Sequence, residues 1–323
     1  MTRKKIRESV KKGDSARLDS LHSHKDGTPT MGGVIILFSL VVSTLLFADW
    51  NERLVWFLLV LTLAFAGIGL IDDLSKLRSG KKGISARAKF SLQIIGGSCA
   101  AAYLFAFPLE AVNSGVAGAG SALYVPIVQE LLPIGAVLFS VFVVLVFVSL
   151  SNAVNLTDGL DGLAAGCSTL CSSTLLIFAL AAASMGWSES LGVPAIVGSS
   201  EVAIFAAALS GAGLGFLWFN CHPARIFMGD TGSLSIGAAV AGIAVVLKQE
   251  ILLGVVSGVL LSEAASVVIQ VASFKTRGKR VFLIAPLHHH FQFKGWKETQ
   301  VTVRFWIAGA VCSLMTIGIL SFS

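Results

Sequence analysis

The sequence predicts an all-α polytopic membrane protein. The chain is 55% hydrophobic and 13% charged, with a mean hydropathy of +0.83, whereas a soluble domain is about 25% charged. Its apolar residues are gathered into long runs, and a helix that spans a membrane needs about 20 mostly apolar residues. The whole chain, residues 1–323, is therefore expected to form a single integral membrane domain.

Nine apolar segments are expected to be helical. They cover roughly residues 34–49, 54–71, 90–107, 134–151, 163–183, 198–218, 233–247, 251–272 and 303–321. Several are short for a membrane span, so tilted or broken helices are expected among them. A short hairpin is expected in the loop from Pro108 to Pro133.

The distribution of Lys and Arg predicts how these segments are oriented across the membrane. If the basic N-terminal segment, residues 1–33, is cytoplasmic, 22 of the 24 Lys and Arg residues fall on the cytoplasmic side, and only Arg53 and Lys248 fall on the other. Cytoplasmic loops carry such an excess of Lys and Arg. The polar motifs fall on the same side, which favours an enzyme with its active site on the cytoplasmic face. Topology also explains the net charge of +6, so no nucleic-acid partner is expected.

A polar stretch, residues 152–166, separates two uncharged apolar runs. Its asparagines and aspartates are Asn152, Asn155, Asp158 and Asp161. Ionisable groups at the end of a membrane helix are costly, which makes a functional site the default interpretation. Asp158 and Asp161 are three residues apart and would share one face of a helical turn, and Gly159 lets a ligand approach the backbone. The alternative is a polar loop with an aspartate capping the next helix.

Two more acidic motifs lie on the same side. Asp72 and Asp73 end the second apolar segment, where adjacent carboxylates suit a divalent metal beside a proton acceptor. A basic run, from Lys76 to Lys89, follows them and is either a topology signal or a site for anionic groups. Asp230 precedes the seventh segment as a helix cap or as a metal ligand in a glycine-rich loop.

Other polar residues lie in or near the last apolar segments. Glu263 and Gln270 interrupt the eighth segment and should face the protein interior or a water-filled cleft. The triplet His288–His290 follows in the next inner loop, where imidazole groups bind phosphate, coordinate metal or move protons. Three consecutive residues cannot share one face, so one or two of them should reach a site.

These motifs together suit phosphoryl transfer. Five aspartates come from three inner segments. Their hard oxygen ligands suit Mg²⁺, whereas a zinc site would contain Cys and His. Neighbouring Lys, Arg and His residues supply positive charge for a diphosphate. A reaction between a nucleotide-activated donor and a lipid phosphate at the inner membrane surface accounts for all of these features. A transporter without chemistry is the remote alternative, and it would place charges at mid-membrane depth, where Glu263 is the candidate.

The motifs also carry a family resemblance that runs from Lys25 to the end of the chain. They are Thr28-Pro-Thr-Met-Gly-Gly33, Ile71-Asp-Asp73, Asn152 to Leu163, Phe227-Met-Gly-Asp-Thr-Gly-Ser233, Pro286-Leu-His-His-His-Phe291, Lys294-Gly-Trp296, Glu298 and Arg304-Phe-Trp306. In this order the chain resembles the phospho-N-acetylmuramoyl-pentapeptide transferase family, within the polyprenyl-phosphate N-acetylhexosamine-1-phosphate transferase superfamily. The uninterrupted histidine triplet points to the muramoyl-pentapeptide branch rather than to a sister N-acetylglucosamine-1-phosphate transferase.

The resemblance implies a bacterial plasma-membrane enzyme of peptidoglycan synthesis. Such an enzyme transfers the phosphosugar from UDP-N-acetylmuramoyl-pentapeptide to undecaprenyl phosphate with Mg²⁺, giving lipid I and UMP. The resemblance is compatible with a homodimer. It does not decide whether the displacement is direct or passes through a covalent aspartyl intermediate. It also implies ten helices, whereas residues 1–24 here are basic and polar; either the first helix is absent or it lies upstream of a late start.

Carried over residue by residue, the resemblance assigns roles to individual side chains. Asp72 matches the base that deprotonates the lipid phosphate, Asp73 lies beside it near the diphosphate, and Asp230 matches the Mg²⁺ ligand. His288 matches the essential histidine of the triplet. The implied substrate contacts are Lys25, Thr30, Lys76, Lys89, Asn152, Asn155, Asp158, Gly159, Asp161, Asn220, Phe227, Ser233, Gln270 and His289.

Overall fold

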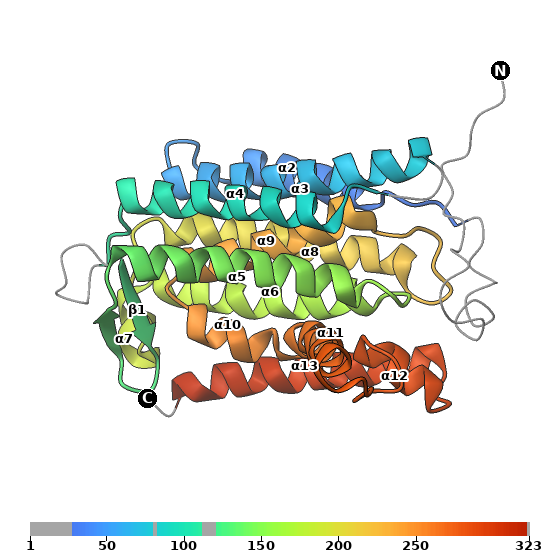
Figure 1. Cartoon of the computed structure of the whole chain (residues 1–323). Coiled ribbons are helices and arrows are strands. Elements are labelled where there is room, and N and C mark those ends of the chain that lie inside the picture. The colour runs from blue at the N-terminus through green and yellow to red at the C-terminus, as the bar shows by residue number, and fades with distance from the viewer. Residues whose placement is uncertain (1–27, 80–82, 112–120, 322–323) are drawn as a thin grey trace, which may run out of the picture.

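The computed structural model describes residues 28–79, 83–111 and 121–321, and most of its helices lie along one common direction (Figure 1). Each predicted apolar segment is helical. The long helices are α2 (Gly33–Phe47), α3 (Arg53–Ser79), α4 (Ala86–Ala106), α5 (Ala136–Thr157), α6 (Leu163–Ala182), α8 (Ser199–Asn220), α9 (Gly229–Val246), α11 (Gly258–Arg277) and α13 (Glu298–Ser321). The short helices are α7 (Met185–Leu191), α10 (Glu250–Val256) and α12 (Leu287–Phe293).

The structure confirms the predicted class of protein, a helical membrane protein with several spans. Among the described residues, seven helices are long and apolar enough to cross a membrane, namely α3, α5, α6, α8, α9, α11 and α13. Helix α2 is also apolar but has only 15 residues. The expected number of nine membrane-spanning helices therefore stays a prediction.

Helix α9 is the centre of the bundle. Every side chain from Thr231 to Val246 is buried, and the helix packs against α2, α3, α5, α6 and α8. Small residues permit this close packing: a Cβ atom added to Gly237 would overlap the backbone of Ser151 on α5. The first turn of α9 is therefore held firmly between its neighbours, and that turn carries Asp230.

The apolar segment predicted over residues 251–272 forms two helices, which makes it one of the broken helices that the sequence led us to expect. The chain breaks at Ser257 into α10 and α11, with Gly254 and Gly258 on either side of the break. Glycine is a poor helix former, and the Ser257 hydroxyl bonds to the Leu253 carbonyl, which favours the break. Figure 1 shows α11 almost end-on, so it leaves the common direction of the bundle.

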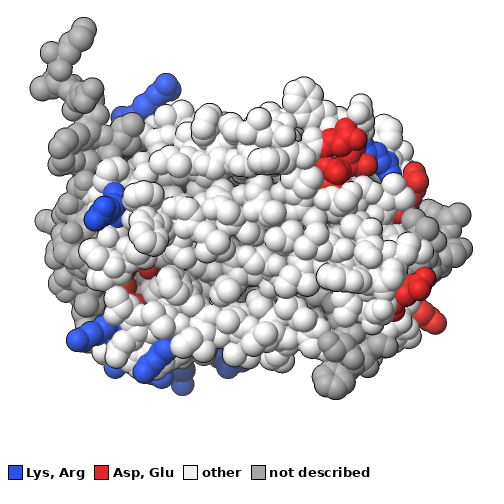
Figure 2. All heavy atoms as spheres, turned by 180° about the vertical axis from the view of Figure 1, so that it is seen from behind, with Lys and Arg blue, Asp and Glu red and all other residues white. Residues whose placement is uncertain are grey.

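The two ends of the bundle carry opposite charges. Figure 2 shows Lys and Arg side chains gathered at one end and Asp and Glu side chains mainly at the other. The first end, where α3 and α5 finish and α9 starts, is called the basic end below. The predicted hairpin lies at the opposite end, where β1 (Ala122–Val125) pairs antiparallel with β2 (Glu130–Pro133). The predicted orientation, in which the basic end is cytoplasmic, stays a prediction.

Candidate active site

Asp72, Asp73 and Asp230 lie within the end turns of helices rather than in loops. Helix α3 continues through Asp72 and Asp73 to Ser79, α5 continues to Thr157, and α9 starts at Gly229. One carboxylate oxygen from each of Asp72, Asp73 and Asp230 lies within 4.8 Å of the other two. Glycine makes this approach possible, because a Cβ atom at Gly69 would overlap the Asp230 backbone. The structure thus brings together three of the five aspartates that the sequence placed in one site, and it places Asp161 in a separate group.

Asp73 supports the first turn of α9. Its Oδ1 accepts a hydrogen bond from the Asp230 amide at 3.1 Å, and its Oδ2 accepts bonds from the Thr231 amide at 2.9 Å and hydroxyl at 2.7 Å. A helix start leaves such amides without intrahelical partners. The alternative role of Asp230 as a helix cap is therefore wrong: a carboxylate from α3 occupies that position, and the Asp230 carboxylate points to the lysines.

Two lysines neutralise the carboxylates. Lys76 Nζ lies 2.7 Å from Asp72 Oδ2 and 3.0 Å from Asp230 Oδ2. Lys89, from α4, forms an ion pair with Asp230 Oδ2 and lies 3.5 Å from Asp72 Oδ2. Both lysines were expected at substrate, and the structure places both against the acidic cluster. Their two ammonium groups offset two of the three carboxylate charges.

Polar groups fix the remaining oxygens of the cluster. Asp72 Oδ1 accepts a hydrogen bond from the Ile84 amide at 2.8 Å, and Asp72 is only 3% exposed. Asn155 Nδ2 donates to Asp230 Oδ1 at 3.1 Å and to Ser233 Oγ at 2.9 Å. Asn155 therefore holds the Asp230 oxygen that is not paired with the lysines, and Ser233 in turn fixes Asn155; both residues were expected at the site.

A second polar group forms around the turn between α5 and α6. Asp161 Oδ2 lies 3.1 Å from His222 Nδ1 and accepts a bond from the Ala224 amide at 3.0 Å. The Asp161 amide donates to Glu298 Oε1 at 2.9 Å. Asp158 directly follows α5, and residues 158–162 form a turn. The expectation that Asp158 and Asp161 share a helical face is therefore wrong.

Asn220 joins this turn to the loop that leads to α9. Its Oδ1 accepts a hydrogen bond from the Gly162 amide at 3.1 Å, and its Nδ2 donates to the Ile226 carbonyl at 2.8 Å. In the same loop, the Phe227 amide donates to the Pro29 carbonyl at 2.8 Å. Asn220 is buried and the Phe227 side chain is half-buried. These bonds fix the loop beside the turn that carries Asp161.

The histidine triplet opens α12, and its members have different surroundings. His288 is 1% exposed, and its Nδ1 lies 3.1 Å from Glu263 Oε2. His289 Nδ1 lies 2.9 Å from Gln292 Oε1, and His290 Nδ1 accepts a hydrogen bond from the Leu283 amide at 3.1 Å. Burial and the charge of Lys294 lower the pKa of His290, so its ring is mostly neutral at pH 7.

The remaining expected substrate contacts take part in other interactions or lie outside the described part of the chain. Asn152 bonds to Gln93 Oε1 at 2.8 Å, which joins α5 to α4. Gln270 accepts hydrogen bonds from the amides of Val281 and Phe282 and thereby holds the loop after α11. Thr30 is half-buried next to Gly229. Lys25 lies outside the described residues.

Three polar residues near the site were not among the predicted site residues. His222 and Glu298 meet Asp161 although they lie 61 and 137 residues away along the chain. The Glu263 side chain contacts His288, 25 residues further on. One signal was available for Glu263, because a carboxylate within an apolar segment needs a polar partner. No spacing rule connects the other two to Asp161.

The cluster of Asp72, Asp73 and Asp230 fits a hard divalent cation. It offers oxygen donors alone, whereas the group of Asp161, His222 and Glu298, which is equally compact, includes an imidazole. Asp73 is bound to backbone amides, so the oxygens paired with lysines on Asp72 and Asp230 are the ones that could exchange a partner for a metal ion.

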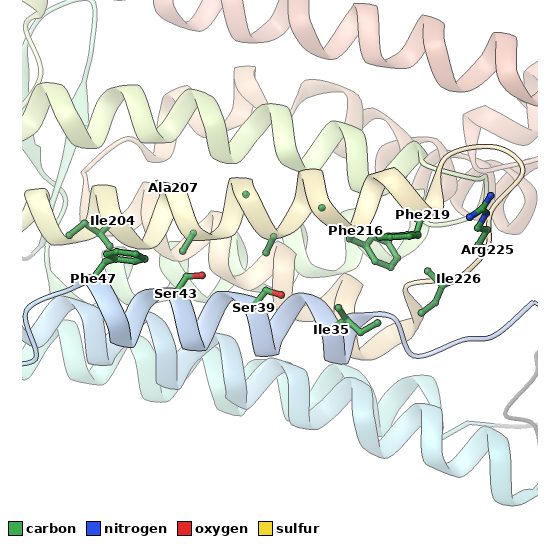
Figure 3. A pocket seen from close by; sticks show the side chains of 14 residues that line it. Ile35, Ser39, Ser43, Phe47, Ile204, Ala207, Phe216, Phe219, Arg225 and Ile226 are labelled. Carbon is green, nitrogen blue, oxygen red and sulfur yellow. The ribbon is translucent and has the colours of Figure 1, made fainter. Parts of the chain in front are cut away.

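A large groove lies apart from these groups. It has a volume of about 1020 Å³ and runs between α2 and α8, from Phe47 to Arg225 (Figure 3). Its walls are mainly apolar or small side chains such as Ile204 and Ala207. None of the aspartates described above lines it.

Comparison with known proteins identifies the class and then the family. Residues 55–248, which include all the aspartates of both groups, match the sequence model of glycosyl transferase family 4. Residues 25–37 match phospho-N-acetylmuramoyl-pentapeptide-transferase signature 1. The chain is 45% identical over 312 residues to a phospho-N-acetylmuramoyl-pentapeptide-transferase of Desulfotalea psychrophila, covering 95% of this chain and 84% of that protein. It therefore belongs to glycosyl transferase family 4 and, within it, to the phospho-N-acetylmuramoyl-pentapeptide-transferase family.

Proposed function

We propose that the protein transfers phospho-N-acetylmuramoyl-pentapeptide from its UDP-activated donor to undecaprenyl phosphate, which gives lipid I and UMP. The observation that carries this proposal is the cluster of three carboxylates and two lysines at the end of an apolar bundle. At such a boundary a lipid-borne phosphate and a water-soluble nucleotide can meet. The sequence of the Desulfotalea relative supports the muramoyl donor.

Asp72 is the proposed base. It takes the proton of the lipid phosphate, whose oxygen then attacks the sugar-bearing phosphorus of the donor while the bond to UMP breaks. Asp72 is held by the Ile84 amide and Lys76, so its carboxylate is fixed at one position before substrate binds. A carboxylate placed to accept a proton supports direct attack by the lipid phosphate without a covalent enzyme intermediate.

Lys76 and Lys89 are the proposed diphosphate contacts. Both ammonium groups already lie among carboxylates, and phosphoryl transfer depends mainly on positioning and on charge neutralisation. Asp230 would hold Mg²⁺, which would supply positive charge for the donor diphosphate. Asp73 then acts through α9, because it fixes the turn that carries Asp230.

The nucleoside end of the donor is proposed to lie at the turn of residues 158–162. Asn220 and Phe227 lie on the loop joined to this turn, and Asp161 supplies a fixed carboxylate. The basic end is proposed to face the cytoplasm of a bacterial cell, because Lys and Arg gather there (Figure 2). The UDP-linked donor is then on the side where the site opens.

Release of UMP by the detergent-purified protein tests this function. Reactions contain UDP-N-acetylmuramoyl-pentapeptide, undecaprenyl phosphate and Mg²⁺; parallel reactions omit the lipid or use the Asp72→Asn variant. We expect lipid-dependent release that the variant loses. Release with UDP-N-acetylglucosamine in place of the muramoyl donor would instead assign the chain to the sister N-acetylglucosamine-1-phosphate activity.

A further inference from the structure

The buried carboxylate of Glu263, on α11, contacts His288, the first histidine of the triplet. Glu263 and His288 are 0% and 1% exposed. Glu263 Oε1 accepts a hydrogen bond from the His288 backbone amide at 3.0 Å, and Glu263 Oε2 lies 3.1 Å from His288 Nδ1. One carboxylate therefore fixes both the start of α12 and the orientation of the imidazole ring.

This contact determines which ring nitrogen is available. An ionised carboxylate only accepts hydrogen bonds, so Nδ1 of His288 carries a proton towards Glu263. The other nitrogen, Nε2, is buried and has no hydrogen-bond partner among the described residues. A buried polar atom without a hydrogen-bond partner reduces the stability of the folded protein. A ligand bound at the candidate site would supply the missing partner of Nε2.

The direction of Nε2 points to the candidate active site. It lies against Gly159, where an added Cβ atom would overlap it. Gly159 follows Asp158 in the turn between α5 and α6, and α5 also carries Asn155, which bonds to Asp230. The imidazole therefore faces the turn where the proposed function places part of the donor.

We propose that Glu263 is a positioning residue for the reaction. It holds the His288 ring with Nδ1 protonated, so that Nε2 is presented at the turn of residues 158–162 to a polar group of the bound donor. This inference rests on the proposed function. It gives a role to a carboxylate that lies outside the region matched by the family model, residues 55–248.

The test is Glu263→Gln in the UMP-release assay. The amide keeps the size of the side chain, but it has one acceptor oxygen for two donors. We expect kcat to fall about 10- to 100-fold, in the range seen when a group that orients a functional histidine is removed, and we expect the pH profile of kcat to shift while KM changes little. Glu130→Gln is the control, because Glu130 is exposed on β2 at the opposite end of the bundle and should leave kcat and its pH profile unchanged.

A second comparison separates positioning from folding. In a His288→Asn background, Glu263→Gln should have no further effect on kcat, because coupled residues are not additive. Wild-type kcat and an unchanged pH profile in Glu263→Gln, or full additivity with His288→Asn, would overturn the inference. Absence of lipid-dependent UMP release by the wild-type protein would instead contradict the proposed function.

Discussion

Asp73 of α3 holds Thr231 of α9 through a single oxygen, with Oδ2 2.9 Å from the Thr231 amide and 2.7 Å from its hydroxyl. The other oxygen of Asp73 accepts a bond from the Asp230 amide. Two adjacent aspartates therefore have different functions. Asp72 pairs with lysines in the cluster, whereas Asp73 fixes the helix end that positions Asp230.

Asp73→Asn should both destabilise the protein and reduce its activity. An asparagine offers one acceptor oxygen for three donors, so amides at the start of α9 lose partners, at about 1–3 kcal/mol for a buried unsatisfied group. We expect a lower unfolding temperature together with a strong loss of UMP release. Asp49→Asn, in an exposed turn at the opposite end, should leave both unchanged. A variant with wild-type stability would show that Asp73 does not support α9.

Composition and charge were enough to predict the helical membrane bundle and some of the site residues. Ionisable groups next to apolar membrane segments are costly, so Asp72, Asp73 and Asp230 could be assigned to one site, together with Asp158 and Asp161, before their distances were known. Their place within helices could not be predicted, because hydropathy falls before the hydrogen-bonded helix stops. Asp72 thus lies inside α3 rather than at its boundary.

The rest depended on which helices pack together. Asp161 meets Glu298 because α13 packs against α6, and His288 meets Glu263 because α12 lies against α11. Neither pairing has a local sequence pattern. The break at Ser257 was likewise hidden within a continuous apolar run, since hydropathy does not report a change of helix direction.

Gly159→Ala should disturb His288 without unfolding the protein. The added methyl group overlaps His288 Nε2, and overpacking a filled space costs about 1–3 kcal/mol. We expect at least about a tenfold loss of kcat, comparable to an imperfectly placed catalytic group. Gly186→Ala on α7, where an added Cβ meets nothing within 4 Å, is the control. Equal activity in the two variants would argue against a role for the His288–Gly159 contact.

Glu250→Gln should stabilise the protein at alkaline pH. Burial raises the pKa of Glu250 from 4.5 to about 7, against an opposing effect of Lys248. Between these values the folded state keeps a proton that the unfolded state releases, so stability falls as the pH rises from about 4.5 to 7. The variant removes a penalty on the order of 3 kcal/mol at pH 8 and little at pH 4.

The measurement for Glu250→Gln is the unfolding temperature at pH 4 and pH 8, in the same detergent. Exposed Glu130 on β2 provides the control variant, Glu130→Gln, which should follow the wild-type protein at both pH values. A stabilisation of equal size at both pH values would mean that packing, and not the charge of Glu250, causes the effect.

Metal binding should depend on Asp230 and not on Asp161, although both belong to compact acidic groups. A ligand that binds the folded state stabilises it, by about 2.7 kcal/mol when its concentration is 100 times Kd. We therefore expect Mg²⁺ to raise the unfolding temperature of the wild-type protein relative to EDTA. Asp230→Asn should abolish this rise, and Asp161→Asn should keep it, because the Asp161 carboxylate is bonded to the Ala224 amide and to His222. The reverse pattern would place the metal at the turn between α5 and α6, and it would separate Mg²⁺ from the lysine-paired oxygens of Asp72 and Asp230.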